Sequence, residues 1–267
     1  MAPFIAIERV SKAFGSDVGP VPVIDDVSLT IAEGEFVVFL GPSGCGKTTL
    51  MRMVGGLDHP SEGLIRLAGE PVTGPSRAKG MVFQSYSSFP WLTVLKNIRF
   101  GLRYRDDVSE TEADRIARHY LELVGLTAYA EFYVNRVSGG MRQRVAIART
   151  LAANPQVLLM DEPFGALDAQ TRERLQVQLL DIRRAERKTV IFVTHDVDEA
   201  IFLADRIVVF SARPAQVIRD IKVAERVPGE RTLDSREGRP FLDLRREILA
   251  IIREEAQRSE AALIAVG

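Results

Sequence analysis

The sequence predicts an α/β fold, in which a β-sheet carries helices on its faces. Two observations lead to this fold class. Apolar segments of strand length, such as residues 36–40 and 157–160, alternate with segments of helical spacing. A glycine-rich loop joins the first of these strands to a helix-prone run at residues 50–55. With 267 residues, 46% of them hydrophobic, the chain can bury the core of one large domain or of a core with a smaller lobe.

The first third of the chain is expected to be rich in strands. Residues 4–10 and 23–31 show partial period-2 alternation, and a loop that carries Phe14 separates them. The continuous apolar run at residues 36–40 is typical of a strand buried on both faces of a parallel sheet. Further short strands are predicted on either side of a turn-rich segment, at residues 63–67 and 80–83.

The middle of the chain changes to helical spacing. Residues 92–102 and 111–124 predict a helical lobe that runs to about residue 136. Strands and helices then alternate again. The predicted helices lie at residues 141–153, 169–187 and 196–204, and the predicted strands at 157–160, 189–193 and 207–210.

The tail has a different composition. Residues 224–240 are rich in charge, proline and glycine, which is typical of a linker. Apolar residues then recur at helical spacing with charges between them: Phe241, Leu244, Ile248, Ile251 and Ile252. We expect this amphipathic helix to dock on the main body, and a partner-binding role is the alternative.

Composition excludes several classes of protein. The net charge of −1 gives no electrostatic reason to expect nucleic acid or an anionic membrane surface as a partner. The single cysteine, Cys45, excludes a disulfide framework. The N-terminus lacks a secretory signal, and the longest strictly apolar run, Ala261 to Val266, is too short to span a bilayer. We therefore expect the chain to lie in the cytosol.

The segment GPSGCGKTT, residues 41–49, has the pattern of a phosphate-binding loop between a strand and a helix. Glycines without side chains let successive backbone N–H groups curl around an anion, and the following helix adds the positive end of its dipole. Lys47 supplies a cation for the β- and γ-phosphates, and the Thr48 hydroxyl can bind Mg²⁺. Cys45 is expected to be a spacer, with a redox-sensitive thiol as the alternative. The expected nucleotide-binding residues are Gly41, Ser43, Gly44, Cys45, Gly46, Lys47, Thr48 and Thr49.

Two acids follow the apolar strand at residues 157–160. This places Asp161 and Glu162 at the carboxyl edge of a parallel sheet, where such folds bind ligands. Asp161 is expected to hold Mg²⁺, and Glu162 to polarise the attacking water as general base. Two solvated acids at the end of a strand are the alternative interpretation.

A second possible anion site lies at Ser138, Gly139 and Gly140, which precede a predicted helix. Taken alone, Ser138 is a helix N-cap. One chain has no obvious use for two phosphate sites, whereas two chains that face each other would use both.

With these residues in place, the chain resembles the ABC-type ATPases. Residues 137–144, VSGGMRQR, match the signature motif of that family, and residues 165–168, GALD, match its D-loop. Gln84 matches the Q-loop glutamine, and His195 matches the switch histidine. Phe14 lies where the family places an aromatic ring that stacks on adenine. The resemblance covers residues 4–222.

The resemblance implies a P-loop ATPase fold with a mixed sheet, an N-terminal antiparallel β-subdomain and an inserted helical subdomain. It places the nucleotide-binding core at residues 4–91 and 137–222, the helical subdomain at 92–136, and a linker with the C-terminal helix at 223–267. All of these belong to a single ABC ATPase domain.

The resemblance also implies a head-to-tail homodimer that holds two ATP molecules. The phosphate loop of one subunit would then face Ser138, Gly139 and Gly140 of the other. Gln84 would be one of the groups around the metal ion and the attacking water. His195 would hydrogen-bond the γ-phosphate. Asp168 would link the two sites across the interface. The implied catalytic set is Glu162, His195, Gln84 and Lys47, and the implied Mg²⁺ ligands are Thr48, Gln84 and Asp161.

Two positions depart from the general family pattern, namely Met141 in place of glutamine and Gly165 in place of a frequent serine. Together with FPWLTV at residues 89–94 and FGALDA at residues 164–169, they make the chain similar to importer ATPases of the nitrate/sulfonate/taurine group.

This similarity implies an ATPase subunit of a bacterial importer, bound at the cytoplasmic face of the inner membrane. Its expected partners are two membrane-spanning permease subunits and an extracytoplasmic solute-binding protein. Permease contact is expected near residues 84–95, where Tyr86, Phe89 and Trp91 offer an apolar surface. The alternative is that Phe89 and Trp91 pack within the helical lobe. A non-transport ABC ATPase and an exporter ATPase are the alternative functions.

Overall fold

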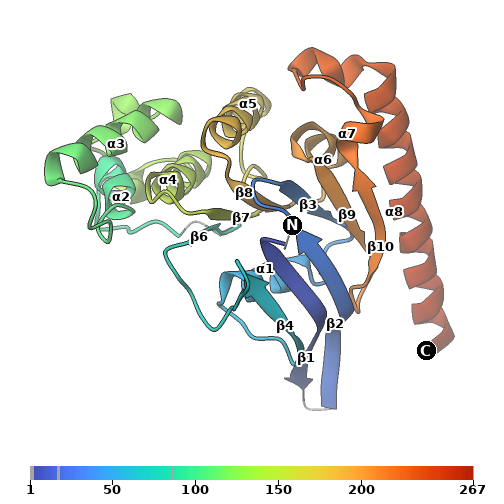
Figure 1. Cartoon of the computed structure of the whole chain (residues 1–267). Helices are drawn as coiled ribbons and strands as arrows, with labels where there is room; N and C mark the ends of the chain where they lie inside the picture. The colour runs from blue at the N-terminus through green and yellow to red at the C-terminus, as the bar shows by residue number, and fades with distance from the viewer. Residues whose placement is uncertain (1–2, 17–18, 86, 267) are drawn as a thin grey trace. The chain divides into compact units, whose positions relative to one another are not determined.

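The computed structural model describes residues 3–16, 19–85 and 87–266, with their side chains up to residue 258 (Figure 1). The chain folds as two units. The first unit comprises Met1–Ser76 and Thr189–Gly267, and the second comprises Arg77–Lys188. The division expected from the sequence, a core at residues 4–91 and 137–222 around a helical subdomain at 92–136, stays a prediction.

The first unit contains an antiparallel sheet with the order β2-β1-β4-β5. Its strands are β1 (Ile5–Ser16), β2 (Gly19–Ile31), β4 (Glu62–Leu67) and β5 (Glu70–Pro71). The expectation that Phe14 lies in a loop is wrong, because β1 and β2 continue as a hairpin in which Phe14 pairs with Val21. Register shifts between residues 7 and 13 of β1 absorb the irregular sequence without ending the strand.

A mixed sheet forms the core of the first unit. Its central strand, β3 (Phe36–Leu40), runs parallel to β8 (Thr189–Val193) and to β9 (Arg206–Phe210). The edge strand β10 (Val217–Lys222) pairs antiparallel with β9. Every residue of β3 is inaccessible to solvent, as its continuous apolar run predicts. Helix α1 (Lys47–Gly55) packs on β8, and α6 (Val197–Leu203) packs on β3.

The tail of the chain is ordered and docks on the first unit. The expected linker instead contains α7 (Val223–Arg226) and a 3₁₀ turn at Leu233–Glu237, because Val223 and Val227 are buried and fix its path. Helix α8 (Arg239–Val266) follows and packs on α6 and α7 (Figure 1). The predicted docking of its apolar face is confirmed by three side chains that are at most 2% exposed, namely Phe241, Leu244 and Ile248.

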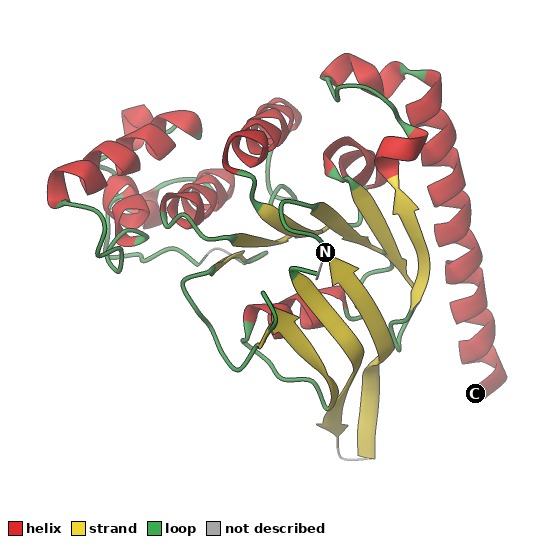
Figure 2. Ribbon diagram, in the orientation of Figure 1, coloured by secondary structure: helices red, strands yellow, loops and turns green. Residues whose placement is uncertain are grey.

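The second unit is mostly helical (Figure 2). Its two strands, β6 (Lys79–Val82) and β7 (Val157–Asp161), pair in parallel. Helix α4 is its centre, since it packs against α2, α3 and β6. The helices are α2 (Val94–Phe100), α3 (Glu110–Leu123), α4 (Gly139–Ala152) and α5 (Ala169–Glu186), with 3₁₀ turns at Thr127–Tyr129 and Val134–Arg136.

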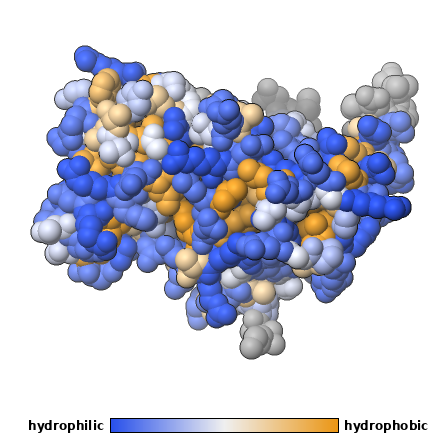
Figure 3. Space-filling view, turned by 90° about the horizontal axis from the view of Figure 1, so that it is seen from above, coloured by the Kyte–Doolittle hydropathy of each residue, from blue (hydrophilic) through white to orange (hydrophobic). Residues whose placement is uncertain are grey.

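The surface is mixed in character. On the face shown in Figure 3, hydrophilic residues predominate and hydrophobic residues form separate patches between them. None of the helices in the described part of the chain combines the length and the apolar character that crossing a membrane requires.

The docking of α8 gives a stability prediction. Ile248 is fully buried, so Ile248→Ala leaves a cavity and should lower the free energy of unfolding by about 2–5 kcal/mol, as measured by circular dichroism in urea. Ile252→Ala is the matched control on the same helix, and it should cost less because Ile252 is only half-buried. Equal stability of the Ile248→Ala variant and the unaltered chain would contradict the docking.

Candidate functional site

The glycine-rich loop lies where the sequence predicts it, between the end of β3 and the start of α1. Gly41 has φ of 154°, and a Cβ atom there would lie 2.7 Å from the carbonyl oxygen of Phe210. Gly46 has φ of 123°, and a Cβ atom there would lie 2.9 Å from the carbonyl oxygen of Val23. Both positions therefore require glycine for conformation and for space. The loop is held between the end of β9 on one side and β2 on the other.

Lys47 begins α1 and is only 5% exposed. Its ammonium group donates hydrogen bonds to the carbonyl oxygens of Gly41 at 2.8 Å and Pro42 at 2.6 Å. It also lies 3.5 Å from the sulfur of Cys45, which is 1% exposed. The buried thiol agrees with a spacer, because reactivity requires access to solvent.

The remaining loop residues differ in exposure. Ser43, Gly44 and Thr48 are exposed, and Thr49 is half-buried. The exposed part of the loop and of the first turn of α1 thus carries backbone N–H groups and the Thr48 hydroxyl group, next to the buried ammonium group of Lys47. This is the donor set that a polyphosphate requires.

His195 is exposed and lies between β8 and α6. The N–H of Thr194 donates to the carbonyl oxygen of Phe39 at 3.3 Å, which ties this junction to the end of β3. Asp196, and not His195, caps α6. Its carboxylate accepts hydrogen bonds from the N–H groups of Asp198 at 2.9 Å and Glu199 at 3.1 Å.

Phe14 presents an aromatic ring in the first unit. Its side chain is 41% exposed, and the ammonium group of Lys12 lies 4.9 Å from the ring centroid. Lys12 is itself held by an ion pair with Asp58 at 2.7 Å. A flat ring with solvent access suits stacking on a base. The first unit therefore carries the phosphate loop, Phe14 and His195.

The second unit carries the two acids at the end of β7. Asp161 is 5% exposed, and Glu162 is half-buried with φ of 42°. A positive φ is costly for a residue with a side chain and is frequent at functional sites. The amide Nε2 of Gln84 donates a hydrogen bond to Glu162 Oε2 at 3.1 Å. The structure thus brings together two predicted catalytic side chains that lie 78 residues apart in the sequence.

The two other predicted motifs of this unit are helix N-termini. Ser138 caps α4, and its hydroxyl accepts the N–H of Met141 at 3.3 Å. Asp168 caps α5, and the N–H of Thr171 donates to its carboxylate at 3.0 Å. That hydrogen bond holds the pKa of Asp168 below its ordinary value. A Cβ atom on Gly140 would lie 3.2 Å from the carbonyl oxygen of Ala166, so the two motifs are neighbours.

Helix α4 also holds the chain on either side of Gln84, through residues that sequence reasoning missed. The Gln143 side chain donates to the carbonyl oxygen of Phe83 at 3.2 Å. Arg149 donates to the hydroxyl of Ser87 at 2.8 Å, and burial lowers the pKa of its guanidinium. The available signal was that Gln143 and Thr150 lie seven residues apart, on a helix face that is otherwise apolar and buried.

Asn97 is a second missed residue, and it is fully buried in α2. Its amide group makes four hydrogen bonds to the backbone of residues 89–93, at 2.8–3.2 Å. These bonds fix the turn that presents Trp91, which is 69% exposed. The ring of Phe89 packs instead, with its centroid 4.3 Å from that of Phe100. Tyr86, the third aromatic residue expected on this surface, lies outside the described residues.

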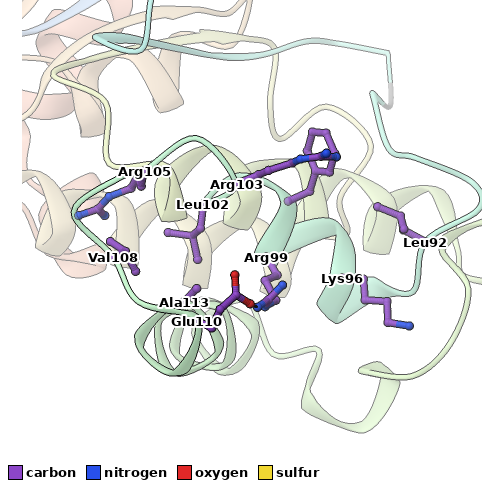
Figure 4. A pocket seen from close by; sticks show the side chains of 10 residues that line it. Leu92, Lys96, Arg99, Leu102, Arg103, Arg105, Val108, Glu110 and Ala113 are labelled. Atoms are coloured by element: carbon purple, nitrogen blue, oxygen red, sulfur yellow. Dashed lines mark hydrogen bonds and ion pairs between the residues drawn. The ribbon is translucent and has the colours of Figure 1, made fainter.

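A hollow lies beside this turn (Figure 4). Helix α2, the connection that follows it and the start of α3 supply a lining that mixes apolar side chains with charged ones. Arg99 pairs with Glu110 and with Asp114, and Arg105 pairs with Asp107 at 2.6 Å. The residues that line the hollow are Leu92, Lys96, Arg99, Phe100, Leu102, Arg103, Arg105, Val108, Glu110 and Ala113.

Comparison with known proteins agrees with this set of motifs. Residues 24–165 match the family model described as ABC transporter. The chain is 46% identical over 255 residues to an uncharacterized ABC transporter ATP-binding protein of Methanocaldococcus jannaschii, covering 96% of this chain and 93% of that protein. It is 43% identical over 262 residues to the nitrate import ATP-binding protein NrtD of Synechocystis, covering 96% of this chain and 98% of that protein.

The chain also resembles the solved structure of a protein with hydrolysis products bound. The chain superimposes with a TM-score of 0.76 on a dimeric ATP-binding cassette in a post-hydrolysis state bound to ADP and phosphate. The two sequences are 34% identical, and the alignment covers 82% of this chain and 98% of that one. The predicted mixed sheet, antiparallel sheet and helices, and the predicted ATPase activity, are thereby confirmed. The chain belongs to the ABC transporter family and is an ATP-binding, ATP-hydrolysing subunit.

Proposed function

We propose that this chain energises the uptake of a small solute as the ATPase subunit of a bacterial importer. The observation that carries the proposal is that a chain 43% identical to a nitrate import subunit has both a glycine-rich loop before α1 and Ser138 as the N-cap of α4. The solute would be nitrate, a sulfonate or a taurine-like compound.

In this proposal the phosphate loop holds the triphosphate. The N–H groups between Gly41 and Thr49 and the ammonium of Lys47 surround the β- and γ-phosphates, and Phe14 stacks on the adenine. The close approach of Gly41 and Gly46 to the carbonyl oxygens of Phe210 and Val23 supports a fixed path of the loop around the anion. His195 donates a hydrogen bond to the γ-phosphate.

Mg²⁺ fits the residues present. Among the described residues, no group of three or more His, Cys, Asp or Glu side chains is placed to hold a metal ion. Mg²⁺ instead uses one or two protein oxygens with substrate phosphates and water. Thr48, Gln84 and the buried carboxylate of Asp161 would supply such oxygens. The ion would neutralise charge on the phosphates.

Glu162 is the general base in this proposal. Its carboxylate accepts a proton from the water that attacks the γ-phosphate, and Gln84 orients the carboxylate through the hydrogen bond at 3.1 Å. Lys47 stabilises the charge that develops on the phosphate oxygens. Each of these groups comes from this chain.

The partner of Ser138 would be a nucleotide on a second copy of the chain. Ser138, Gly139 and Gly140 begin a helix of 14 residues, whose N-terminus favours an anion. In a head-to-tail dimer this segment faces the γ-phosphate on the other subunit, and Asp168 lies beside the same interface. Closing on ATP and opening after hydrolysis would drive the change in shape of the permease.

The permease contact is proposed at residues 84–95 and at the neighbouring hollow of Figure 4. Exposed Trp91 offers an apolar anchor, and Lys96 and Arg103 at the hollow favour an acidic segment of the permease. Two permease subunits and an extracytoplasmic binding protein would complete the importer. The chain would then lie peripherally, on the cytoplasmic face of the inner membrane.

Removing the general base should separate binding from turnover. Glu162→Gln should retain ATP binding but lower the rate of hydrolysis by roughly 10²–10⁴-fold, because the amide cannot accept the proton. Phosphate release and nucleotide titration measure the two quantities. Glu122→Gln, an exposed site on α3, is the control and should change neither. Near-normal hydrolysis by Glu162→Gln would remove Glu162 from this role.

The proposed dimer interface has a matched control within the second unit. Ser138→Arg should leave nucleotide binding by the monomer intact and block ATP-dependent dimerisation, because a bulky cation would fill the anion site. Ser109 caps α3 with a hydrogen bond of 3.3 Å to the N–H of Glu112, the same length that Ser138 makes. Ser109→Arg should therefore dimerise normally in light scattering. Dimerisation of both variants would refute the shared site.

The transport function is tested by reconstitution. The chain is combined in proteoliposomes with the permease and the binding protein whose genes lie next to its own, and ATPase activity is measured for each solute. The proposal predicts stimulation by one solute class and accumulation of that solute in the compartment that contains the nucleotide. Export from the compartment that contains ATP, or a gene without a neighbouring permease, would favour an exporter or a non-transport ATPase.

A further inference from the structure

The tail of the first unit holds helix α6 at three places along its length. Near its start, Arg245 Nε lies 2.7 Å from Asp198 Oδ1, an ion pair between α8 and the first turn of α6. In its last turn, the Arg236 guanidinium lies 4.3 Å from the ring centroid of Phe202. At its end, Arg231 donates a hydrogen bond to the carbonyl oxygen of Ala204. We call Arg231, Arg236 and Arg245 the arginine clasp.

The clasped helix is short and begins close to His195. It has seven residues, and Asp196 alone separates it from the histidine. The cap formed by Asp196 makes the backbone after His195 continuous with the first turn of the helix. A small rotation or shift of α6 therefore moves the His195 backbone with it.

Apolar packing and the clasp contribute differently to this arrangement. The apolar face of α8 is buried through Phe241, Leu244 and Ile248. This burial supplies most of the free energy that holds α8 on the first unit. The Arg245 and Asp198 side chains are 45% and 42% exposed, and such exposed pairs add little stability. Contacts at both ends of one helix instead restrict how it can turn or slide on an apolar surface. Apolar packing alone is not directional.

We infer that the tail positions His195 through α6, with the arginine clasp as its positioning residues. The inference rests on the proposed role of His195 at the γ-phosphate and assigns to the tail a part in hydrolysis. Correct placement of the imidazole raises the rate of turnover, whereas the phosphate loop holds ATP without it. Loss of the clasp should therefore lower kcat and leave the KM for ATP almost unchanged.

The test compares two triple variants of the full chain. Arg231→Gln, Arg236→Gln and Arg245→Gln together remove the clasp. Arg239→Gln, Arg246→Gln and Arg253→Gln make the same change of charge on exposed positions of the tail, where Arg239 and Arg246 pair with Asp243 within α8. The clasp variant should lose about tenfold in kcat, because small misplacements of catalytic groups have effects of this size, with KM within about twofold. The control should retain both.

A spectroscopic measurement follows His195 directly. The chain has three histidines, so each imidazole gives a resolvable signal in the NMR spectrum. The clasp variant should shift and broaden the signal of His195 and leave those of His59 and His119 in place. An unchanged His195 signal would overturn the inference, whatever happens to activity. If the triple variant does not fold, the single variants Arg245→Gln and Arg246→Gln are compared instead, since both residues are exposed neighbours on α8. Arg245→Gln should then shift the His195 signal by a smaller amount, and Arg246→Gln should leave it in place.

A double-mutant cycle separates positioning from general loss of structure. In a His195→Ala background, removal of the clasp should change kcat by less than about twofold, because the residue that it positions is gone and the effects are not additive. An equal loss in both backgrounds would show that the clasp acts elsewhere and would overturn the inference. If His195→Ala alone hydrolyses ATP normally, the proposed role of His195 fails, and the NMR measurement still decides whether the tail holds it.

Discussion

The close approach of backbone to backbone at the phosphate loop is the constraint on which the rest of the structure depends. At Gly41 and at Gly46 a Cβ atom would lie within 3 Å of a carbonyl oxygen, on Phe210 and on Val23 respectively. The loop is thus fixed by the end of β9 and by β2, and its N–H groups are set before any ligand arrives. Such preorganisation favours binding, because the loop loses little conformational entropy when the ligand binds.

The second unit joins its functional parts through one helix. The N-terminus of α4 carries the signature segment at Ser138, and its later turns hold Phe83 and Ser87 on either side of Gln84. Gln84 in turn holds Glu162. A shift of the turn that presents Trp91 would therefore be transmitted to Glu162 and to Ser138 together. The inferred clasp gives the first unit a comparable link, from the tail to His195.

Much of this arrangement could be predicted from the sequence. Strands buried on both faces have continuous apolar runs, so β3, β7 and β8 were found at nearly their observed positions. The cap at Ser138 was also predicted, because its signal is local. The fold family followed from motifs in a fixed order.

Other features depend on contacts between distant residues and could not be predicted. The edge strand β10 is half-exposed and antiparallel, so its residues, VIRDIK, lack an apolar run. The hairpin through Phe14 continues past bulges that resemble a loop in the sequence. The hydrogen bond from Gln143 to Phe83 joins residues 60 apart, and the one from Arg231 to Ala204 joins residues 27 apart. Such pairings arise from tertiary packing, which cannot be read from the amino-acid composition or the hydrophobic periodicity of the sequence.

The central claim is that two copies of the chain share each bound nucleotide. Native mass spectrometry with a non-hydrolysable ATP analogue tests it most directly, since it counts chains and nucleotides in one complex. The account predicts an assembly of two chains and two nucleotides that disappears when the analogue is removed. A single chain with one nucleotide, in a preparation that hydrolyses ATP at its full rate, would contradict it.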